Sequence, residues 1–419
     1  MLASRRSLYL TTLLTLAISG AAIGQGHLAA ETAGPAPAGA ANSSANETAL
    51  MKDWLARWQT RMQGEARDRS CVREMGEELG WLVSPILNGD YYGYGATHDP
   101  VWVDRLIDWT DSCIKRGIKE PDGYIGWPKA DGASTPVVPG LYTDNILGEA
   151  MLLRPAVLMA QTILKTPSLK AKYVVKATSY IKLAEDTFKK WDSRGCWRDV
   201  KVGGVWVVPT FGMDQKTGKW TEGYARRLTD GFSLPANKQN FIARWLLTLY
   251  DVTGKAVYRE RAEGWFRQMK SRMKLQDGKY YVWDYWDPAG PWDYKADGST
   301  KHWVGVHPNG GYYGIDLDAI VDAYEHHLVF TKADLDKLIA TNRDFMWNHQ
   351  VQGAKFRSID GASHDDRWKN SPGILWIALT PYDATLRQVF EANYDPAGWG
   401  GLSTTPWFIA RGVGPLPAS

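Results

Sequence analysis

Cysteine and histidine are scarce in this chain of 419 residues, and their scarcity excludes several kinds of site. The three cysteines, Cys71, Cys113 and Cys196, show no CxxC spacing, and no paired histidines accompany them. Structural zinc sites use closely spaced Cys and His ligands, so we expect none here. No segment matches a calcium-binding loop either, and the protein is expected to need no metal or cofactor.

A strong charge of one sign is also lacking. The chain holds 49 Lys and Arg against 46 Asp and Glu, a formal net charge of +3 that includes Arg5 and Arg6. Acidic and basic residues are interspersed along the whole sequence. Electrostatic capture of nucleic acid is therefore not expected.

One apolar run near the start has the features of an export signal. Residues 8–23 follow two arginines and are too short and too rich in small residues to span a membrane permanently. We expect residues 1–24 to be a signal peptide and the mature protein to be secreted or periplasmic, without membrane association. Export permits a disulfide between Cys71 and Cys113, although buried free thiols fit as well.

The next segment is of low complexity. Residues 25–49 consist largely of Ala, Gly, Ser, Pro, Asn and Thr, which predicts a disordered linker. No second break of this kind follows. Residues 50–419 are therefore predicted to form a single domain, and we expect a monomer.

Aromatic residues are abundant, with 21 Trp and 20 Tyr. Flat aromatic faces stack on the apolar faces of sugar rings, and their NH and OH groups can bond hydroxyls. Most of them are expected in the core. The remainder are expected in loops: Tyr91, Tyr92 and Tyr94 in NGDYYGYG, and Trp283, Tyr285, Trp286, Trp292 and Tyr294 in YYVWDYWDPAGPWDY. These favour a carbohydrate-binding surface.

Apolar residues recur every three or four positions over most of the domain, which predicts helices. These are expected at residues 50–67, 101–116, 145–165, 173–191, 237–254, 255–273, 315–327 and 333–347, with a further pair between 371 and 391. The segment 145–165 is apolar nearly all round, as in an inner helix, and 173–191 has a polar face. The pattern predicts an all-α, (α/α) toroid fold, an incomplete barrel of about six or seven helix hairpins.

Local signals mark helix ends and one insertion. Asn237 is a plausible N-cap, Gly254 a C-terminal stop, and Thr331 with Asp334 resembles a capping box. The alternating segment 195–211 predicts a small β-hairpin between helices.

A resemblance to a known family rests on three motifs. They are NKQNFIARWLLTLYDVTGKAVYRERAEGWFRQM, a WDYWDP loop, and HPNGGYYGIDLDAIVDAYE. Together they resemble the repeat units of α/α-toroid polysaccharide lyases, most closely the alginate and glucuronan lyases, over residues 144–347. The chain departs from the family at Asn309 and Tyr313, where related proteins often carry an acidic Glu-Asp pair and a His.

The resemblance implies β-elimination on a uronate-containing polysaccharide, with a Tyr as base or acid. Such a reaction needs the uronate carboxylate neutralised, its C5 proton removed and the leaving oxygen protonated. Tyr313, after a Gly-rich turn, is the candidate base or acid, with His307 beside it and Asn240 neutralising the carboxylate. Packing over the helix start explains Tyr313 equally well, and a turn position explains His307.

Further residues are candidates for contact with the acidic polysaccharide. They lie at predicted helix starts, in aromatic loops and in charged loops, and they are Asn237, Tyr312, Asn309, Arg227, Trp286, Tyr285, Asn145, Glu149 and Arg367. Capping explains Asn237 as well, and a solvated loop explains Arg367.

Three alternatives to a lyase remain open. A glycoside hydrolase on the same scaffold needs two carboxyl groups across the scissile bond. Its candidates, with no diagnostic pair among them, are Asp144, Glu149, Asp230, Asp284, Asp287, Asp316 and Asp318. A uronate C5-epimerase would share the first proton transfer, and a non-catalytic glycan-binding protein would use the aromatics alone.

Overall fold

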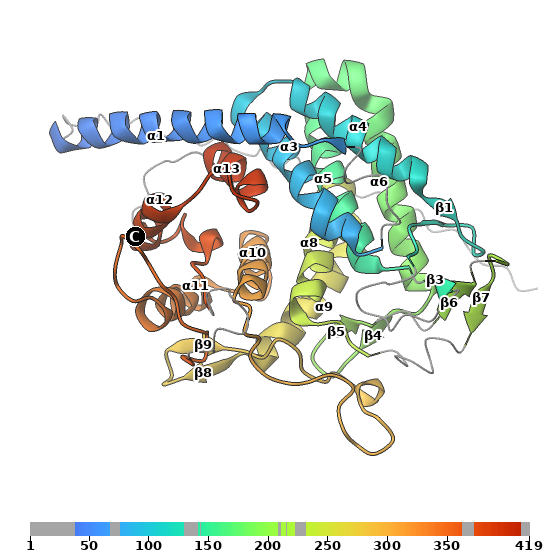
Figure 1. Ribbon diagram of the computed structural model, residues 1–419. Coiled ribbons are helices and arrows are strands. Elements are labelled where there is room, and N and C mark those ends of the chain that lie inside the picture. The colour runs from blue at the N-terminus through green and yellow to red at the C-terminus, as the bar shows by residue number, and fades with distance from the viewer. Residues whose placement is uncertain are drawn as a thin grey trace, which may run out of the picture. The chain divides into compact units, whose positions relative to one another are not determined.

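Helical hairpins make up most of the chain (Figure 1). This computed structural model describes residues 38–67, 76–129, 141–142, 144–207, 211–214, 216–222, 232–362 and 373–411. Residues 50–419 form one compact unit and residues 1–49 another.

An inner ring of helices surrounds the centre of the larger unit. Its members are α3 (Ser84–Thr97), preceded by the π-helix η1 (Leu79–Val83), then α5 (Ile146–Lys165), α8 (Ala236–Thr253), α10 (Gly311–Glu325), the 3-10 helix η5 (Ile377–Leu379) and α13 (Gly401–Ala410). Each packs on the next from α3 to η5, and α13 packs back on α3. The described inner elements therefore follow a ring around the unit's centre (Figure 1).

A second layer of helices lies outside this ring. It consists of the part of α1 (Ala38–Gln63) from residue 50 onward, α4 (Val101–Arg116), α6 (Pro167–Ser193), α9 (Ala256–Arg272), α11 (Lys332–Ala340) continued by the π-helix η3 (Thr341–Met346), and α12 (Ala384–Asn393). Among these, α4 packs on α3 and α5, α6 on α5 and α8, and α9 on α8 and α10. The alternation of outer and inner helices confirms the predicted α/α toroid.

The connections differ between the two ends of the ring. Those from an inner helix to the next outer helix are short, as at residues 98–100, 166 and 254–255. Those from an outer helix to the next inner helix are long, as at 117–145, 194–235 and 273–310. The long connections therefore gather at the N-terminal ends of the inner helices.

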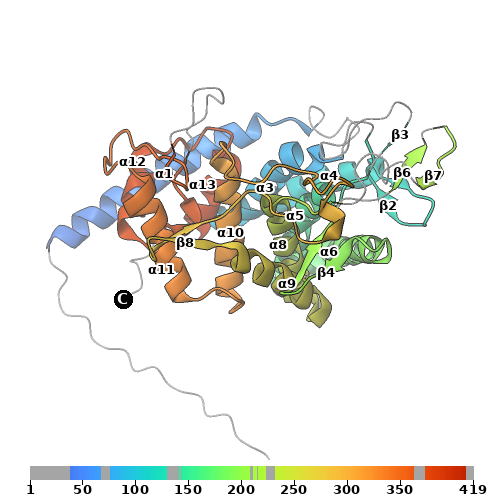
Figure 2. The same ribbon diagram turned by 90° about the horizontal axis from the view of Figure 1, so that it is seen from below.

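All the described strands lie in these long connections. They are β1 (Ile118–Lys119), β2 (Ile125–Gly126), β3 (Leu141–Tyr142), β4 (Trp197–Asp199), β5 (Gly204–Trp206), β6 (Phe211–Asp214), β7 (Trp220–Glu222), β8 (Lys274–Gln276) and β9 (Tyr280–Val282), with the 3-10 helix η2 (Pro291–Asp293) after them. They form antiparallel hairpins β1–β2, β4–β5 and β8–β9 and a sheet in the order β3–β6–β7. The β4–β5 hairpin, Trp197 opposite Trp206, confirms the predicted insertion. Both views place β3, β6 and β7 on the side of the unit opposite α11 and α12 (Figure 2).

Several predicted helix ends are confirmed, and others differ from the prediction. Gly254 ends α8 with a φ of 69°, and Thr331 with Asp334 forms the capping box of α11. Asn237 was wrong as an N-cap, because α8 begins at Ala236 and Pro235 occupies the cap position. Helix α1 begins at Ala38, within the segment expected to be a linker, where alanine favours helix.

The tyrosines of NGDYYGYG lie in helix α3, and their expected loop position was wrong. The glycines of this run serve close packing. A Cβ on Gly93 would come within 2.4 Å of Trp58, and one on Gly89 within 2.5 Å of the Leu402 carbonyl oxygen. The small residues therefore let α3 pack closely against its neighbours.

Helix α5 is long and apolar enough to span a membrane by composition alone. However, 78% of its apolar window is buried within the unit. Ala150, Leu153 and Val157 belong to the main hydrophobic core. Helix α5 is therefore the central helix of the core, as the nearly uniform apolar pattern predicted.

Candidate functional site

A cavity of about 430 Å³ opens inside the ring of inner helices. Its wall includes Trp81 from η1, Met151 from α5, Phe241 from α8, Ile315 from α10 and Trp407 from α13. A volume of this size lies in the range of small-ligand pockets. The cavity is therefore large enough to hold part of an organic ligand.

Two arginines and two aspartates form another part of the cavity wall. Arg244 Nε donates to Asp322 Oδ2 at 2.6 Å, and its Nη1 donates to Asp318 Oδ2 at 3.0 Å. Arg154 also donates to Asp322, at 3.3 Å. The opposite charges on this part of the wall neutralise one another.

A carboxylate lies at the N-terminal end of the ring, held by two inner helices. Asn145, the N-cap of α5, donates from Nδ2 to Glu77 Oε1 at 2.8 Å, and Lys238 Nζ in the first turn of α8 donates to the same oxygen at 2.7 Å. Trp81 Nε1, on the cavity wall, donates to Glu77 Oε2 at 3.4 Å. Lys238 and two helix N-termini thus surround Glu77 with positive potential.

A ladder of stacked aromatic rings lies beside this carboxylate. Trp303 stacks on Tyr285 with ring centroids 5.5 Å apart, and Tyr285 stacks on Tyr312 at 5.2 Å. Trp303 is 45% exposed, whereas Tyr285 is largely buried. An exposed aromatic face at the end of a rigid stack is suited to stacking on a sugar ring.

Electrostatics link the ladder to Glu77. Burial raises the pKa of Tyr285, and the nearby phenol of Tyr312 and the carboxyl groups of Asp316 and Glu77 raise it further. Burial followed by the charge of Glu77 also raises the pKa of Tyr312. Both phenols therefore keep their protons at neutral pH, which suits them to donate a hydrogen bond or a proton.

His307 joins the same group of rings. Its ring lies 4.6 Å from that of Tyr312 and 4.7 Å from that of Tyr285. The backbone N–H of Asn309 donates to His307 Nδ1 at 2.9 Å, so the acceptor nitrogen is Nδ1 and Nε2 carries the proton. Asn309 Oδ1 in turn accepts from the backbone N–H of Gly311, at the start of α10. Asn309 therefore fixes this turn.

The structure does not place the Tyr313 phenol at the cleft, as the sequence analysis expected. Tyr313 is 2% exposed and belongs to the main core. Its hydroxyl accepts from the backbone N–H of His307 at 3.0 Å and donates to the Trp283 carbonyl at 3.4 Å. Because α10 begins at Gly311, Tyr313 turns inward and is buried. Burial raises the pKa of its phenol far above the usual range. A catalytic role for Tyr313 stays a prediction.

Asn240 lies in the core and not at a substrate surface. It is fully buried in α8, donates to Asp316 Oδ1 at 2.6 Å and accepts from Trp265 Nε1 at 2.7 Å. Trp283 Nε1 donates to the other Asp316 oxygen at 2.9 Å. These bonds pair the Asn240 amide with an internal carboxyl group. A role for Asn240 in neutralising a uronate stays a prediction.

Other substrate-contact candidates are placed as follows. Glu149 is buried and bonded to Lys190 and to Trp191. Trp286 is also buried and donates to the Ser233 carbonyl at 2.7 Å. Both side chains lie inside the unit, and their expected contact with the polysaccharide stays a prediction.

Asn237 has an unusual environment. Its side chain is fully buried at the start of α8, and neither amide atom has a hydrogen-bond partner among the described residues. Buried amides are nearly always bonded. Asn237 therefore keeps its place among the substrate-binding candidates, next to Lys238. Arg227, Arg367 and Asp230 lie outside the described residues.

Sequence reasoning missed Glu77, Lys238, Trp81 and Trp303. Glu77 and Glu78 precede an apolar helix, where acidic residues are common for capping reasons alone. This glutamate is distinguished by its contacts with Asn145 and Lys238, which lie 68 and 161 residues away from it in the sequence. No local pattern contains that information.

Comparisons with known proteins give a likeness of arrangement only. No protein-family model matches the sequence, and no curated protein matches it. Among solved structures, D-mannose isomerase has a TM-score of 0.48 and 11% identity, covering 86% of this chain and 85% of that one. The GH76A α-1,6-mannanase of Salegentibacter sp. HEL1_6 has a TM-score of 0.46 and 13% identity, covering 86% of this chain and 97% of that one. At these values the likeness carries no information about chemistry.

Proposed function

We propose that this protein is a carbohydrate-active enzyme that hydrolyses glycosidic bonds, with Glu77 as the base or nucleophile. One observation carries the proposal: Glu77 is held by Asn145 and Lys238 at the N-terminal end of the ring, beside an aromatic ladder. Carboxyl groups perform this chemistry in most glycoside hydrolases. The proposal assigns one of the two carboxyl groups that hydrolysis needs.

The charges at the site favour a neutral glycan over a uronate. Lys238 forms an ion pair with Glu77, and the Asn240 amide donates a hydrogen bond to Asp316 in the core. A negative Glu77 would repel a substrate carboxylate, since like charges a few Å apart interact unfavourably. We therefore expect a neutral polysaccharide or oligosaccharide, cleaved outside the cytoplasm after removal of the predicted signal peptide.

β-Elimination is a second candidate, favoured by the contact between His307 and Tyr312. The raised pKa of Tyr312 keeps its phenol protonated, as a group that protonates a leaving oxygen must be. An acidic polymer would then be the substrate. The two reactions leave different products, because only elimination creates an unsaturated uronate that absorbs near 235 nm.

The test measures reducing ends and absorbance near 235 nm together, on neutral and acidic polysaccharides. Release of reducing ends without absorbance supports hydrolysis, whereas release with absorbance supports elimination. Glu77→Gln is expected to lower kcat by about 10²- to 10⁴-fold without loss of folding. Glu78→Gln is the matched control, since the neighbouring Glu78 pairs with Lys129 at 2.7 Å. Equal activity of the two variants would refute the role of Glu77.

A further inference from the structure

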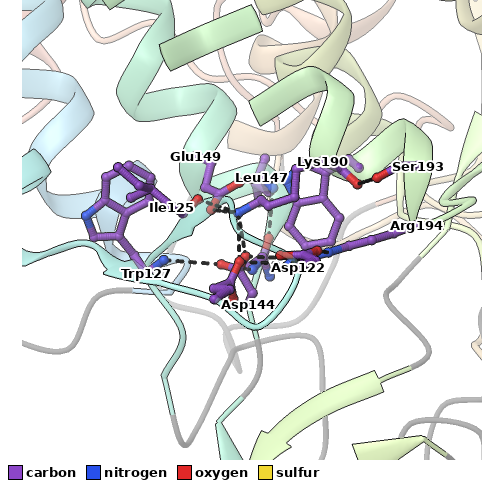
Figure 3. Close-up of polar contacts among 12 residues, drawn as sticks. Asp122, Ile125, Trp127, Asp144, Leu147, Glu149, Lys190, Ser193 and Arg194 are labelled. Atoms are coloured by element: carbon purple, nitrogen blue, oxygen red, sulfur yellow. Dashed lines mark hydrogen bonds and ion pairs between the residues drawn. The ribbon is translucent and has the colours of Figure 1, made fainter. Parts of the chain in front are cut away.

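A network of buried charges lies at the start of α5 (Figure 3). Lys190 Nζ of α6 contacts Asp144 Oδ2 at 2.6 Å, Glu120 Oε2 at 3.3 Å and Glu149 Oε1. Arg194 contacts Glu120 at 2.8 Å and Asp144 at 3.3 Å. All five side chains are almost completely buried.

Asp144 joins this network to the start of α5. Its Oδ2 faces Lys190 and Arg194, while its Oδ1 accepts from the backbone N–H of Asn145 at 3.0 Å and of Trp127 at 3.4 Å. Figure 3 shows Asp144 between the two cations and the Trp127 backbone. The carboxylate thus fixes the residue whose side chain holds Glu77.

Close backbone packing makes this connection rigid. A Cβ on Gly148 would lie 2.1 Å from the Gly76 carbonyl oxygen and 3.2 Å from Glu77 Cα. One on Gly126 would lie 2.5 Å from Glu120 and 2.7 Å from Asp144. The first turn of α5 and the backbone of Glu77 therefore touch, with no room for independent movement.

The charges of the network favour a fixed arrangement. Burial acts to raise the pKa of Asp144, but Lys190 and Arg194 outweigh it and hold that pKa below its usual range. Burial and the charge of Asp144 raise the pKa of Glu120 to about 8. At neutral pH Asp144 is thus the ionised member that binds both cations.

We propose that Asp144 is a positioning residue for Glu77, acting through Asn145 and the first turn of α5. The inference rests on the proposed function for its catalytic consequence. Through this connection the buried network determines where the Asn145 amide lies, and so the orientation of the Glu77 carboxylate.

The test uses Asp144→Asn in the mature protein, with Asp90→Asn as the control. Asp90 is also completely buried and pairs with Arg105 at 3.1 Å, in the α3–α4 region. Asp144→Asn is expected to lower kcat roughly 10- to 100-fold with little change in KM, and to move the limb of the kcat/KM pH profile that depends on Glu77. Asp90→Asn should change stability only.

Hydrogen–deuterium exchange gives a readout without substrate. Asp144→Asn is expected to speed exchange both at residues 144–150 and at residues 76–83, whereas Asp90→Asn should leave both segments unchanged. Faster exchange at 144–150 alone, or an unchanged kcat and pH profile in the folded variant, would overturn the proposal. Absence of any glycan turnover by the unmodified protein would refute the proposed function instead, and the exchange result would still decide the positioning role.

If Asp144→Asn does not fold, Asn145→Asp tests the same connection. This change keeps the oxygen that caps α5 and removes the bond to Glu77. It should lower kcat and shift the pH profile upward, because a second negative charge beside Glu77 favours its protonated form. A pH profile and kcat equal to those of the unmodified protein would overturn the proposal.

Discussion

Two groups of carboxylates meet at the start of helix α5, and they differ in what surrounds them. Glu77 has one lysine, one amide and an indole as partners, and it lies beside aromatic rings that reach the surface. Glu120, Asp144 and Glu149 all contact Lys190, and Glu120 and Asp144 also contact Arg194. All four carboxyl groups are buried, but only Glu77 is bonded to Trp81 of the cavity wall and lies beside the aromatic ladder. The comparison teaches that the neighbours of a buried carboxyl group, and not its burial, distinguish one that holds structure from one at a candidate site.

The largest effect on stability is expected when the network around Lys190 is broken. Lys190→Met leaves the ionised Asp144 and two further buried carboxyl groups without their shared ammonium, which should lower the free energy of unfolding by about 3–5 kcal/mol. Denaturant titration measures this. Lys182→Met is the control, because its partner Asp186 lies one turn away on the exposed face of α6, and little change is expected. Equal stability of the two variants would contradict the importance of the network.

Asp316 offers a third comparison, because it is buried and its partners among the described residues are an amide and an indole, with no cation. Burial raises its pKa to about 7, against bonds from Trp283 and Asn240 that lower it. An unfolded aspartate ionises near pH 4, so the folded state retains the proton between about pH 4 and 7. Stability should therefore fall as pH rises through this window, by roughly 2 kcal/mol between pH 5 and pH 8.

Asp316→Asn should remove this pH dependence. The free energy of unfolding of both proteins, measured by denaturant titration at the two pH values, tests it. The same slope in variant and unmodified protein would mean that other groups cause the change.

The smallest effect is expected at the aromatic ladder beside Glu77. Trp303→Ala removes the exposed end of the ladder and should raise KM about fivefold, the equivalent of about 1 kcal/mol of stacking, with kcat unchanged. Steady-state kinetics on the cleaved glycan measures it. Tyr294→Ala is a suitable control, because Tyr294 is similarly exposed in the same connection but pairs with Thr300 outside the ladder. An equal KM for both variants would argue against stacking on Trp303.

The sequence predicted the helices better than the site, for a physical reason. The apolar periodicity of 101–116 and 255–273 reflects one buried face, so α4 and α9 begin and end within a residue of expectation. In α3, whose tyrosines were expected in a loop, glycines permit contact with Trp58 and Leu402. Local spacing cannot reveal that a glycine faces another helix.

The site depends on contacts between distant segments. Asn145 and Tyr312 were identified because they lie at helix starts, which sequence signals mark. Glu77 and Lys238 are joined only by folding of the ring. Tyr313 was expected at the cleft and Asn240 facing a substrate carboxylate, because a helix start looks the same in sequence whichever way its side chains turn.

The unequal lengths of the connections have a consequence for how this scaffold can change. Insertions are tolerated in long surface loops at small entropic cost, whereas tight turns between packed helices admit few. Substrate preference can therefore be altered by exchanging the segments at 194–235 or 273–310, while the single-residue turn at Thr166 and the turn at Gly254 keep the helices in register. Engineered or natural changes of specificity would therefore alter the end of the ring that carries the long connections, at the N-terminal ends of the inner helices. The end with the short turns would stay almost constant.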